Sequence, residues 1–325
     1  MQLSRRTVLQ LASGAATLAA SSGLARAQAY PARPVRIVVG FPPGGAQDVH
    51  ARLIGEWLSA RLGQPFAVEN RPGAGTNIAT EAVVRAPADG HTLLLVVAAN
   101  TVNATLYDKL AFDFVRDIAP VAGVSRVPLV VVVNPSVTAR TMAELIAEAK
   151  ANPGGLKLGS TGNGGTPHLA GELFKMLSGV DMPHTPFRGA DGAQAGMVEG
   201  RAQVMFSLLP EAIDNVRAGK LRALAVTTAR RVETLPDLPV VADFVQGYEA
   251  STWNGVGAPT GTPVEIVKAL NDAINAGLAD SKIKARLAEQ GSVPLPGSPA
   301  DFGKFIAGET EKWGKVVKFA NLKAS

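Results

Sequence analysis

Short apolar strands that alternate with amphipathic helices constrain the fold of this chain more than any other feature. Residues 35–39 are apolar apart from Arg36, and a helical pattern follows with Val49, Leu53 and Trp57 on one face. Strands alternating with helices predict an α/β fold with a largely parallel sheet. Further strands are predicted over 66–68, 92–97, 129–133, 156–158, 184–187, 203–206 and 221–226, with helices over 77–85, 142–150 and 193–199 and another ending near 177.

The last quarter of the chain has a different pattern. An extended, glycine-rich segment is predicted at 251–259, and two helices follow it. The first is predicted to begin at Thr262-Pro263, where a capping threonine precedes a proline suited to the first helical position, and to end at Gly291. The second is predicted to begin at Ser298.

Residues 1–27 have the three-part layout of a cleaved secretory signal. Arg5 and Arg6 precede an apolar stretch over 8–24, and small residues follow at the two alternative cleavage sites, Ala27 and Ala29. The apolar stretch is interrupted by serine and glycine, whereas a membrane-spanning helix needs about 20 apolar residues. A retained anchor is the alternative, and the paired arginines leave both the secretory and the twin-arginine routes open. We predict export to the periplasm.

Charge and cysteine content exclude several classes of function. The formal charge of +5 falls to +2 once residues 1–27, with three arginines and no acidic residue, are removed. No lysine or arginine cluster remains, so no nucleic-acid partner is expected. The absence of cysteine excludes disulfides, thiol catalysis and cysteine-bound metals. The remaining 298 residues (325 minus 27) exceed what one core normally uses, which predicts two domains.

Two glycine-rich loops, one in each half of the chain, are the candidate binding elements. Gly44-Gly45 lies between a strand and a helix start, where N–H groups at the positive end of the helix dipole suit an anion. A plain turn, with Asp48 merely favourable in the first helical turn, is the alternative there. Residues 159–167 repeat the arrangement, with Thr166 as the predicted cap and Pro167 at the first helical position. Ligands of α/β sheets lie beyond strand carboxyl ends, so one anion clamped between two domains would use both loops.

Enzyme templates do not match this sequence. Ser160 lacks the glycine two positions earlier that a nucleophile elbow requires, and dinucleotide and Walker loops are absent. His50, His91, His168 and His184 do not pair at metal-ligand spacing, and no separated carboxylate pair suits acid–base work. We therefore predict no catalytic residue, no metal and no cofactor.

Six motifs in a fixed order resemble the solute receptors of the tripartite tricarboxylate transporter family, the Bug-type extracytoplasmic binding proteins. The resemblance covers essentially the whole mature chain. The motifs lie within Tyr30–Val39, Pro42–Arg52, Glu69–Gly75, Ala86–Thr92, Gly159–Glu172 and Pro186–Gly189.

The resemblance implies a two-domain, Venus-flytrap architecture of the type II-like periplasmic binding proteins, with a hinge of crossing strands. Lobe 1 would comprise 30–126 and 251–325, and lobe 2 would comprise 127–250. Such a receptor would be a monomer that closes on a ligand carboxylate, partly through water.

The resemblance also implies which residues contact the ligand. In the first loop these are Phe41, Gly45, Ala46 and Asp48, and in the second they are Ser160, Thr161, Gly162, Asn163, Thr166 and His168. The turn at Phe187-Arg188 lies nearby. Ser207 stands where the family often has aspartate, and Phe187-Arg188 where a tyrosine-lysine pair is common. These departures affect the far end of the ligand, and Arg188 is assigned either to that end or to packing.

The implied function is capture of a small carboxylate and its delivery to the membrane permease subunits of a tripartite transporter. A receptor that passes the signal to a sensor protein is a close alternative. A periplasmic hydrolase or lyase using Asp48 or His168 is the rival from another class. Aromatic acids, dicarboxylates and amino acids all carry the group that these loops would bind.

Overall fold

A computed structural model describes residues 30–324, so the predicted signal and its cleavage sites lie outside the described residues. Within this range ten strands form one sheet in the order β2-β1-β3-β9-β4-β7-β5-β6, with β8 and β10 also paired to β4. Helices cover both faces of this sheet, which confirms the predicted α/β class. No helix of residues 30–324 is both long and apolar enough to cross a bilayer.

The first half of the sheet contains the buried parallel strands that the apolar runs predict. Strands β1, β2 and β3 pair in parallel, and β3 continues through the antiparallel strand β9 to β4 and the short β10. Both faces of β1 and β3 are buried, as expected for parallel strands covered by helices on either side. The bounds are β1 Val35–Val39, β2 Phe66–Asn70, β3 Thr92–Val97, β4 Ile118–Val133, β9 Ser251–Pro259 and β10 Val293–Pro294.

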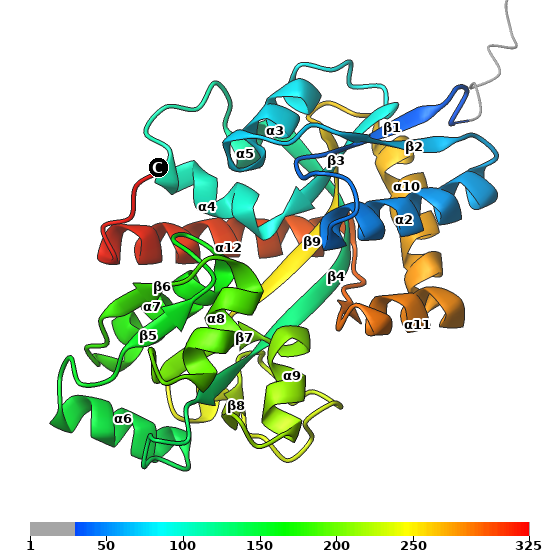
Figure 1. Cartoon of the computed structure of the whole chain (residues 1–325). Coiled ribbons are helices and arrows are strands. Elements are labelled where there is room, and N and C mark those ends of the chain that lie inside the picture. The colour runs from blue at the N-terminus through cyan, green and yellow to red at the C-terminus, as the bar shows by residue number, and fades with distance from the viewer. Residues whose placement is uncertain (1–29, 325) are drawn as a thin grey trace, which may run out of the picture.

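The second half of the sheet is built around the carboxyl-terminal end of β4. Strands β7 and β8 pair antiparallel with that end, while β5 pairs in parallel with both β6 and β7. Figure 1 shows β4 and β9 running side by side between the two groups of elements. The bounds are β5 Leu158–Ser160, β6 His184–Pro186, β7 Val204–Leu208 and β8 Arg222–Val226.

Strand β4 is far longer than the sequence pattern predicts. Its residues 118–128 pair with β9, and its residues 129–133 pair with β7 and β8. Only the second part was expected, because Pro120, Gly123 and Pro128 interrupt the first part and the pairing with β9 shifts register twice. One strand therefore runs through both halves of the sheet.

Two helical layers enclose the first half of the sheet. Side chains of β1 facing one way pack with α2, α10 and α11, and Val38 on the other face packs with α3 and α12. Short helices α4 and α5 and the 3-10 turn η1 complete this half. The bounds are α2 Ala46–Leu62, η1 Ala74–Thr76, α3 Asn77–Val84, α4 Ala98–Leu106, α5 Phe114–Asp117, α10 Val264–Ala279, α11 Ser281–Glu289 and α12 Pro299–Phe319.

The second half has its own cores on the two faces of the sheet. Helices α6 and α7 and the 3-10 turn η2 cover one face, and α8 and α9 cover the other. The bounds are α6 Met142–Ala151, α7 Thr166–Ser178, α8 Gly189–Val198, α9 Leu209–Arg217 and η2 Val241–Asp243.

The carboxyl-terminal helices differ from the prediction in two respects. The single helix expected from Thr262 to Gly291 is wrong, because Asp280 leaves the helical conformation and its side chain accepts hydrogen bonds from the first turn of α11. Helix α10 begins at Val264, with Pro263 as its N-cap. The predicted start at Ser298 is confirmed by a capping box. The end of α12 leaves the first half and packs Trp313, with neighbouring valines, into the core of the second half.

The strand directions place the helix N-termini of the two halves opposite each other. Strand β3 runs parallel to β4, since both are antiparallel to β9, so β1, β2 and β3 end toward the second half. Strand β7 runs antiparallel to β4, so β5, β6 and β7 end toward the first half. The carboxyl ends of both sets of parallel strands therefore face one another, which is where α/β sheets bind ligands.

Candidate functional site

The first glycine-rich loop connects β1 to α2 and lies at the edge that faces the second half. Gly44 has a φ of +86°, a backbone conformation that favours glycine, and Gly45 is the N-cap of α2. Both residues and Ala46 are exposed, and Phe41 is partly buried against the neighbouring core. Because no side chain caps α2, the N–H groups of its first turn are available to a ligand.

The Asp48 carboxylate lies behind this loop and is buried, with 3% of the residue exposed. It accepts hydrogen bonds from the backbone N–H of Gly44 at 2.9 Å and the amide of Asn70 at 2.8 Å, and it forms a two-pronged ion pair with Arg52. The bond from Arg52 outweighs the effect of burial and, with those from Gly44 and Asn70, lowers the pKa of Asp48 to about 2. Both carboxylate oxygens are thus engaged in holding the loop.

The second glycine-rich loop connects β5 to α7 in the same position. Gly162 and Gly164 have φ values of +139° and +72°. The predicted Thr166 cap is wrong: Gly165 is the N-cap, and Thr166 and Pro167 are the first two residues of the helix. Because proline has no N–H, the donors that this first turn offers to a ligand come from the residues around it.

A side chain in the third position of each helix holds the glycine four residues before it. Asp48 accepts from Gly44 N–H in α2, and His168 Nδ1 accepts from Gly164 N–H at 3.0 Å in α7. Both glycines are in the left-handed region. The two loops therefore have the same arrangement. In each, a buried side chain accepts a hydrogen bond from the glycine N–H, and no side chain caps the N-terminus of the helix that follows.

A second histidine supports the loop from below. The Ser160 hydroxyl, which is fully buried, lies 2.6 Å from His184 Nε2 and also bonds the backbone of Gly162. The rings of His168 and His184 are stacked, with centroids 3.6 Å apart. Sequence analysis missed His184 as a site residue, since it is brought to the loop only by the parallel pairing of β6 with β5.

The remaining candidates separate into exposed loop residues and packed ones. Asn163 and Arg188 are exposed, and Thr161, Gly162 and Thr166 are partly exposed. The Phe187 ring packs toward Gly196 of α8, and the Arg201 guanidinium lies over this ring, 5.1 Å from its centroid. Ser207 is fully buried and accepts a hydrogen bond from Gln194 at 2.8 Å.

A third loop, residues 71–76, reaches the same edge and was not singled out as a contact. Ala74 and Thr76 have positive φ values of 47° and 85°, which is strained for residues other than glycine, above all for the β-branched threonine. A Cβ on Gly40 would lie 2.6 Å from Thr76 Cβ, so this loop packs directly on the first one. Asn100 holds the Thr76 hydroxyl at 3.0 Å.

The chemistry of this edge is that of an anion site without a charged side chain at its centre. Two helix N-termini and the hydroxyls of Thr161 and Thr166 offer hydrogen-bond donors, while Asp48 and His168 are occupied by the backbone. Among residues 30–324 no cluster of histidine and carboxylate side chains could hold a metal ion. The arrangement suits an anion and offers no activated nucleophile.

Comparison with known proteins identifies the family. Residues 50–322 match the model of the tripartite tricarboxylate transporter family receptor. The chain is 36% identical to protein BugT of Bordetella pertussis over 94% of its length and 95% of that protein. It resembles R. palustris Rpa4515 with adipate at 38% identity and a TM-score of 0.72, covering 90% and 99% of the two chains.

Two further solved structures extend the comparison. MatC (Rpa3494) from Rhodopseudomonas palustris with bound malate is 30% identical, with a TM-score of 0.68 and coverage of 89% and 100%. A TctC solute binding protein from Polaromonas with no ligand is 26% identical, with a TM-score of 0.82 and coverage of 89% and 99%. These relatives are two-domain solute-binding proteins, and the chain is likewise a receptor and not an enzyme. By its sequence and its fold, this chain belongs to the tripartite tricarboxylate transporter receptor family.

Proposed function

We propose that this protein captures a small carboxylate in the periplasm, between two lobes, and delivers it to the membrane permease of a tripartite transporter. The observation that carries the proposal is the pair of open helix N-termini, α2 and α7, at strand ends that face each other. Support also comes from relatives that hold adipate and malate.

The carboxylate is held by backbone and hydroxyl donors. The N–H groups of Gly45 and Ala46 and those at the start of α7, with the Thr161 and Thr166 hydroxyls, contact it directly or through water. Asp48, Ser160 and His168 act from behind by shaping the loops. Phe187 and Ser207 pack within the second half, and the exposed Arg188 is the residue of that group available to the far end of the ligand.

In this proposal lobe 1 comprises 30–126 and 251–325, apart from the end of α12, which packs into the core of lobe 2, and lobe 2 comprises 127–250. The hinge lies near Pro128 and Leu129, where β4 changes partners, and in the neighbouring strand β9. Hinge strands of this kind absorb the backbone change while lobes move as rigid bodies. The ligand-free Polaromonas protein has a higher TM-score to this chain than Rpa4515 with adipate, although its sequence identity is lower. This difference supports a change in the arrangement of the lobes when ligand binds. The receptor acts as a monomer, and the loaded form is what the permease, or alternatively a sensor protein, recognises.

A carboxylate, but not its amide, is expected to raise the melting temperature. At about one hundred times its Kd, a bound ligand stabilises the fold by about 2.7 kcal/mol, or about 5 °C for a chain of this size. The amide brings a weaker acceptor and an additional donor against a row of N–H donors, so its shift is expected to vanish. Differential scanning fluorimetry of adipate, malate, benzoate and glutamate, each beside its amide, measures this.

Two outcomes of the melting experiment would contradict the proposal. Equal shifts from an acid and its amide would mean that the site does not depend on the carboxylate. No shift from any of the four acids would exclude the three classes of ligand that they represent. Chemical analysis of recovered ligand separates binding from the rival hydrolase or lyase, because a receptor returns the ligand unaltered.

A further inference from the structure

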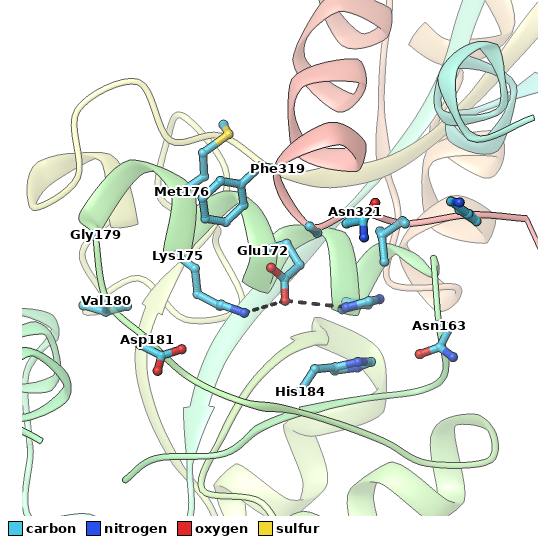
Figure 2. Close-up of a pocket in the computed structure, with 14 residues that line it drawn as sticks. Asn163, Glu172, Lys175, Met176, Gly179, Val180, Asp181, His184, Phe319 and Asn321 are labelled. Carbon is cyan, nitrogen blue, oxygen red and sulfur yellow. Dashed lines mark hydrogen bonds and ion pairs between the residues drawn. The ribbon is translucent and has the colours of Figure 1, made fainter. Parts of the chain in front are cut away.

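A partly buried polar cluster lies directly beneath the second glycine-rich loop. It consists of His168, Glu172 and Lys175 on α7 with His184 at the start of β6, and it borders a cavity of about 810 Å³ beside the chain segment 319–323. Figure 2 shows Glu172 and Lys175 pointing toward one another above the His184 side chain. Among the residues of the proposed binding edge, Asn163 and His168 border this cavity, whereas the first loop and the Thr161 and Thr166 hydroxyls do not, so the cluster needs a separate explanation.

Each histidine of the cluster holds a different point of the loop. His168 Nδ1 accepts the Gly164 N–H at 3.0 Å, and His184 Nε2 lies 2.6 Å from the Ser160 hydroxyl. That hydroxyl in turn bonds the backbone N–H and carbonyl of Gly162. The two rings are nearly parallel, at 7°, so displacing one ring displaces the other. The two glycines with positive φ are thus held by one connected unit.

The hydrogen bond from Gly164 requires a neutral His168. Because His168 Nδ1 accepts a hydrogen bond, its proton is on Nε2, which lies 3.6 Å from a Glu172 oxygen that Lys175 also contacts. Burial lowers the pKa of His184 to about 4. The other charged groups around the cavity are Asp181 and Lys323. A neutral His184 with its proton on Nδ1 can accept the Ser160 hydroxyl proton, whereas a protonated His184 can only donate to that oxygen.

We propose that His184 is a positioning residue for ligand binding, which sets the second loop in its binding conformation before the ligand arrives. The inference rests on the proposed function, since it assigns a role at the same site. A loop with four glycines in seven residues has much conformational entropy to lose on binding. Ordering the loop in advance removes that cost from the binding step and raises affinity.

Two substitutions at His184 and one control separate positioning from general stability. His184→Phe keeps an aromatic ring for stacking and removes the acceptor for Ser160, while His184→Gln places a polar atom near the Nε2 position without the ring. His91→Phe makes the same change at a buried histidine of the first half, on the loop before β3. Hydrogen–deuterium exchange of the ligand-free proteins and calorimetric titration with adipate are the measurements.

His184→Phe is expected to speed amide exchange in residues 160–168, to leave residues 40–48 unchanged, and to weaken adipate binding by about tenfold or more. His184→Gln is expected to fall between His184→Phe and the wild type, and His91→Phe to match the wild type. Unchanged exchange in 160–168 with unchanged affinity would overturn the proposal, as would an equal effect in His91→Phe. If the wild type does not bind adipate, the acid with the largest melting shift replaces it in the titration, and exchange in 160–168 decides the role of His184 in either case.

The pH dependence of binding distinguishes a positioning role of His184 from a purely structural one. As the pH falls toward 4, wild-type His184 becomes protonated and can no longer accept the Ser160 proton, whereas glutamine does not titrate. The ratio of the His184→Gln Kd to the wild-type Kd is therefore expected to fall between pH 6 and pH 4, and titration of the ligand cancels in this ratio. A ratio that stays constant over this range would contradict the proposal.

Discussion

Replacing Gly164 by valine is expected to weaken carboxylate binding by about a hundredfold while leaving the protein folded. The φ of Gly164 is +72°, and a β-branched side chain in this conformation costs a few kcal/mol of backbone strain. Each 1.4 kcal/mol, roughly, corresponds to a tenfold change in affinity, so strain of this size predicts a loss of about a hundredfold. An added Cβ would meet only Leu106, at 4.0 Å, so the strain is confined to the backbone. The loop relieves it by leaving the left-handed conformation, and the donors around the start of α7 then move away from the carboxylate. Calorimetric titration measures the loss.

Helix α7 carries its own control for this substitution. Gly179 caps its far end with a φ of +71°, and an added Cβ there would meet nothing within 4 Å. Gly179→Val thus introduces the same strain away from the loop, and it is expected to lower stability while binding as the wild type does. If both variants lost affinity equally, or if Gly164→Val bound normally, the second loop would not be part of the site.

Removing the Asp48 carboxylate is expected to have the second large effect. Asp48→Ala removes the buried carboxylate that accepts from the Gly44 N–H, the Asn70 amide and Arg52, which costs about 2–3 kcal/mol of unfolding free energy. Affinity is expected to fall by about tenfold or more, since Gly44 no longer anchors the first loop. Urea unfolding and titration measure the two effects.

The pH dependence of stability checks the same residue. The folded-state pKa of Asp48, about 2, lies below its usual value of 3.8, so its contribution is complete above pH 4 and is lost as the pH falls toward 2. Asp48→Ala is expected to remove that part of the acid sensitivity. Asp272→Ala is the control, because its ion pair with Lys268 is exposed and contributes little. A loss in Asp48→Ala no larger than in this control would contradict the anchoring role.

Local sequence patterns were sufficient to predict the buried parallel strands and the positions of the two glycine-rich loops. The strands at 35–39 and 92–97 are continuous apolar runs that end at turn or helix signals, and both form as predicted. The first part of β4 was missed because its prolines and glycine resemble a loop, and only the partner strand β9, about 130 residues later, makes it a strand. The break at Asp280 was missed because the helical pattern continues on both sides of it. Aspartate favours the N-cap over the helix interior, and the structure shows that Asp280 caps α11.

The roles of the site residues depend on neighbours that are distant in sequence. The family resemblance implied that Asp48, Ser160 and His168 contact the ligand. Each turns inward instead, because Asn70 and His184, brought close by parallel strand pairing, complete a hydrogen-bonding network behind the loop. A sequence pattern locates the loop, whereas the direction of a side chain is decided by the polar partners that tertiary packing supplies.

The central claim is that two facing helix N-termini hold one carboxylate. A crystal structure of the complex with the acid that gives the largest melting shift tests it most directly. The expected result places the carboxylate oxygens within hydrogen-bonding distance, directly or through one water, of N–H groups at the starts of both α2 and α7. A carboxylate bound instead by the Arg188 guanidinium, or by one lobe alone, would contradict the account.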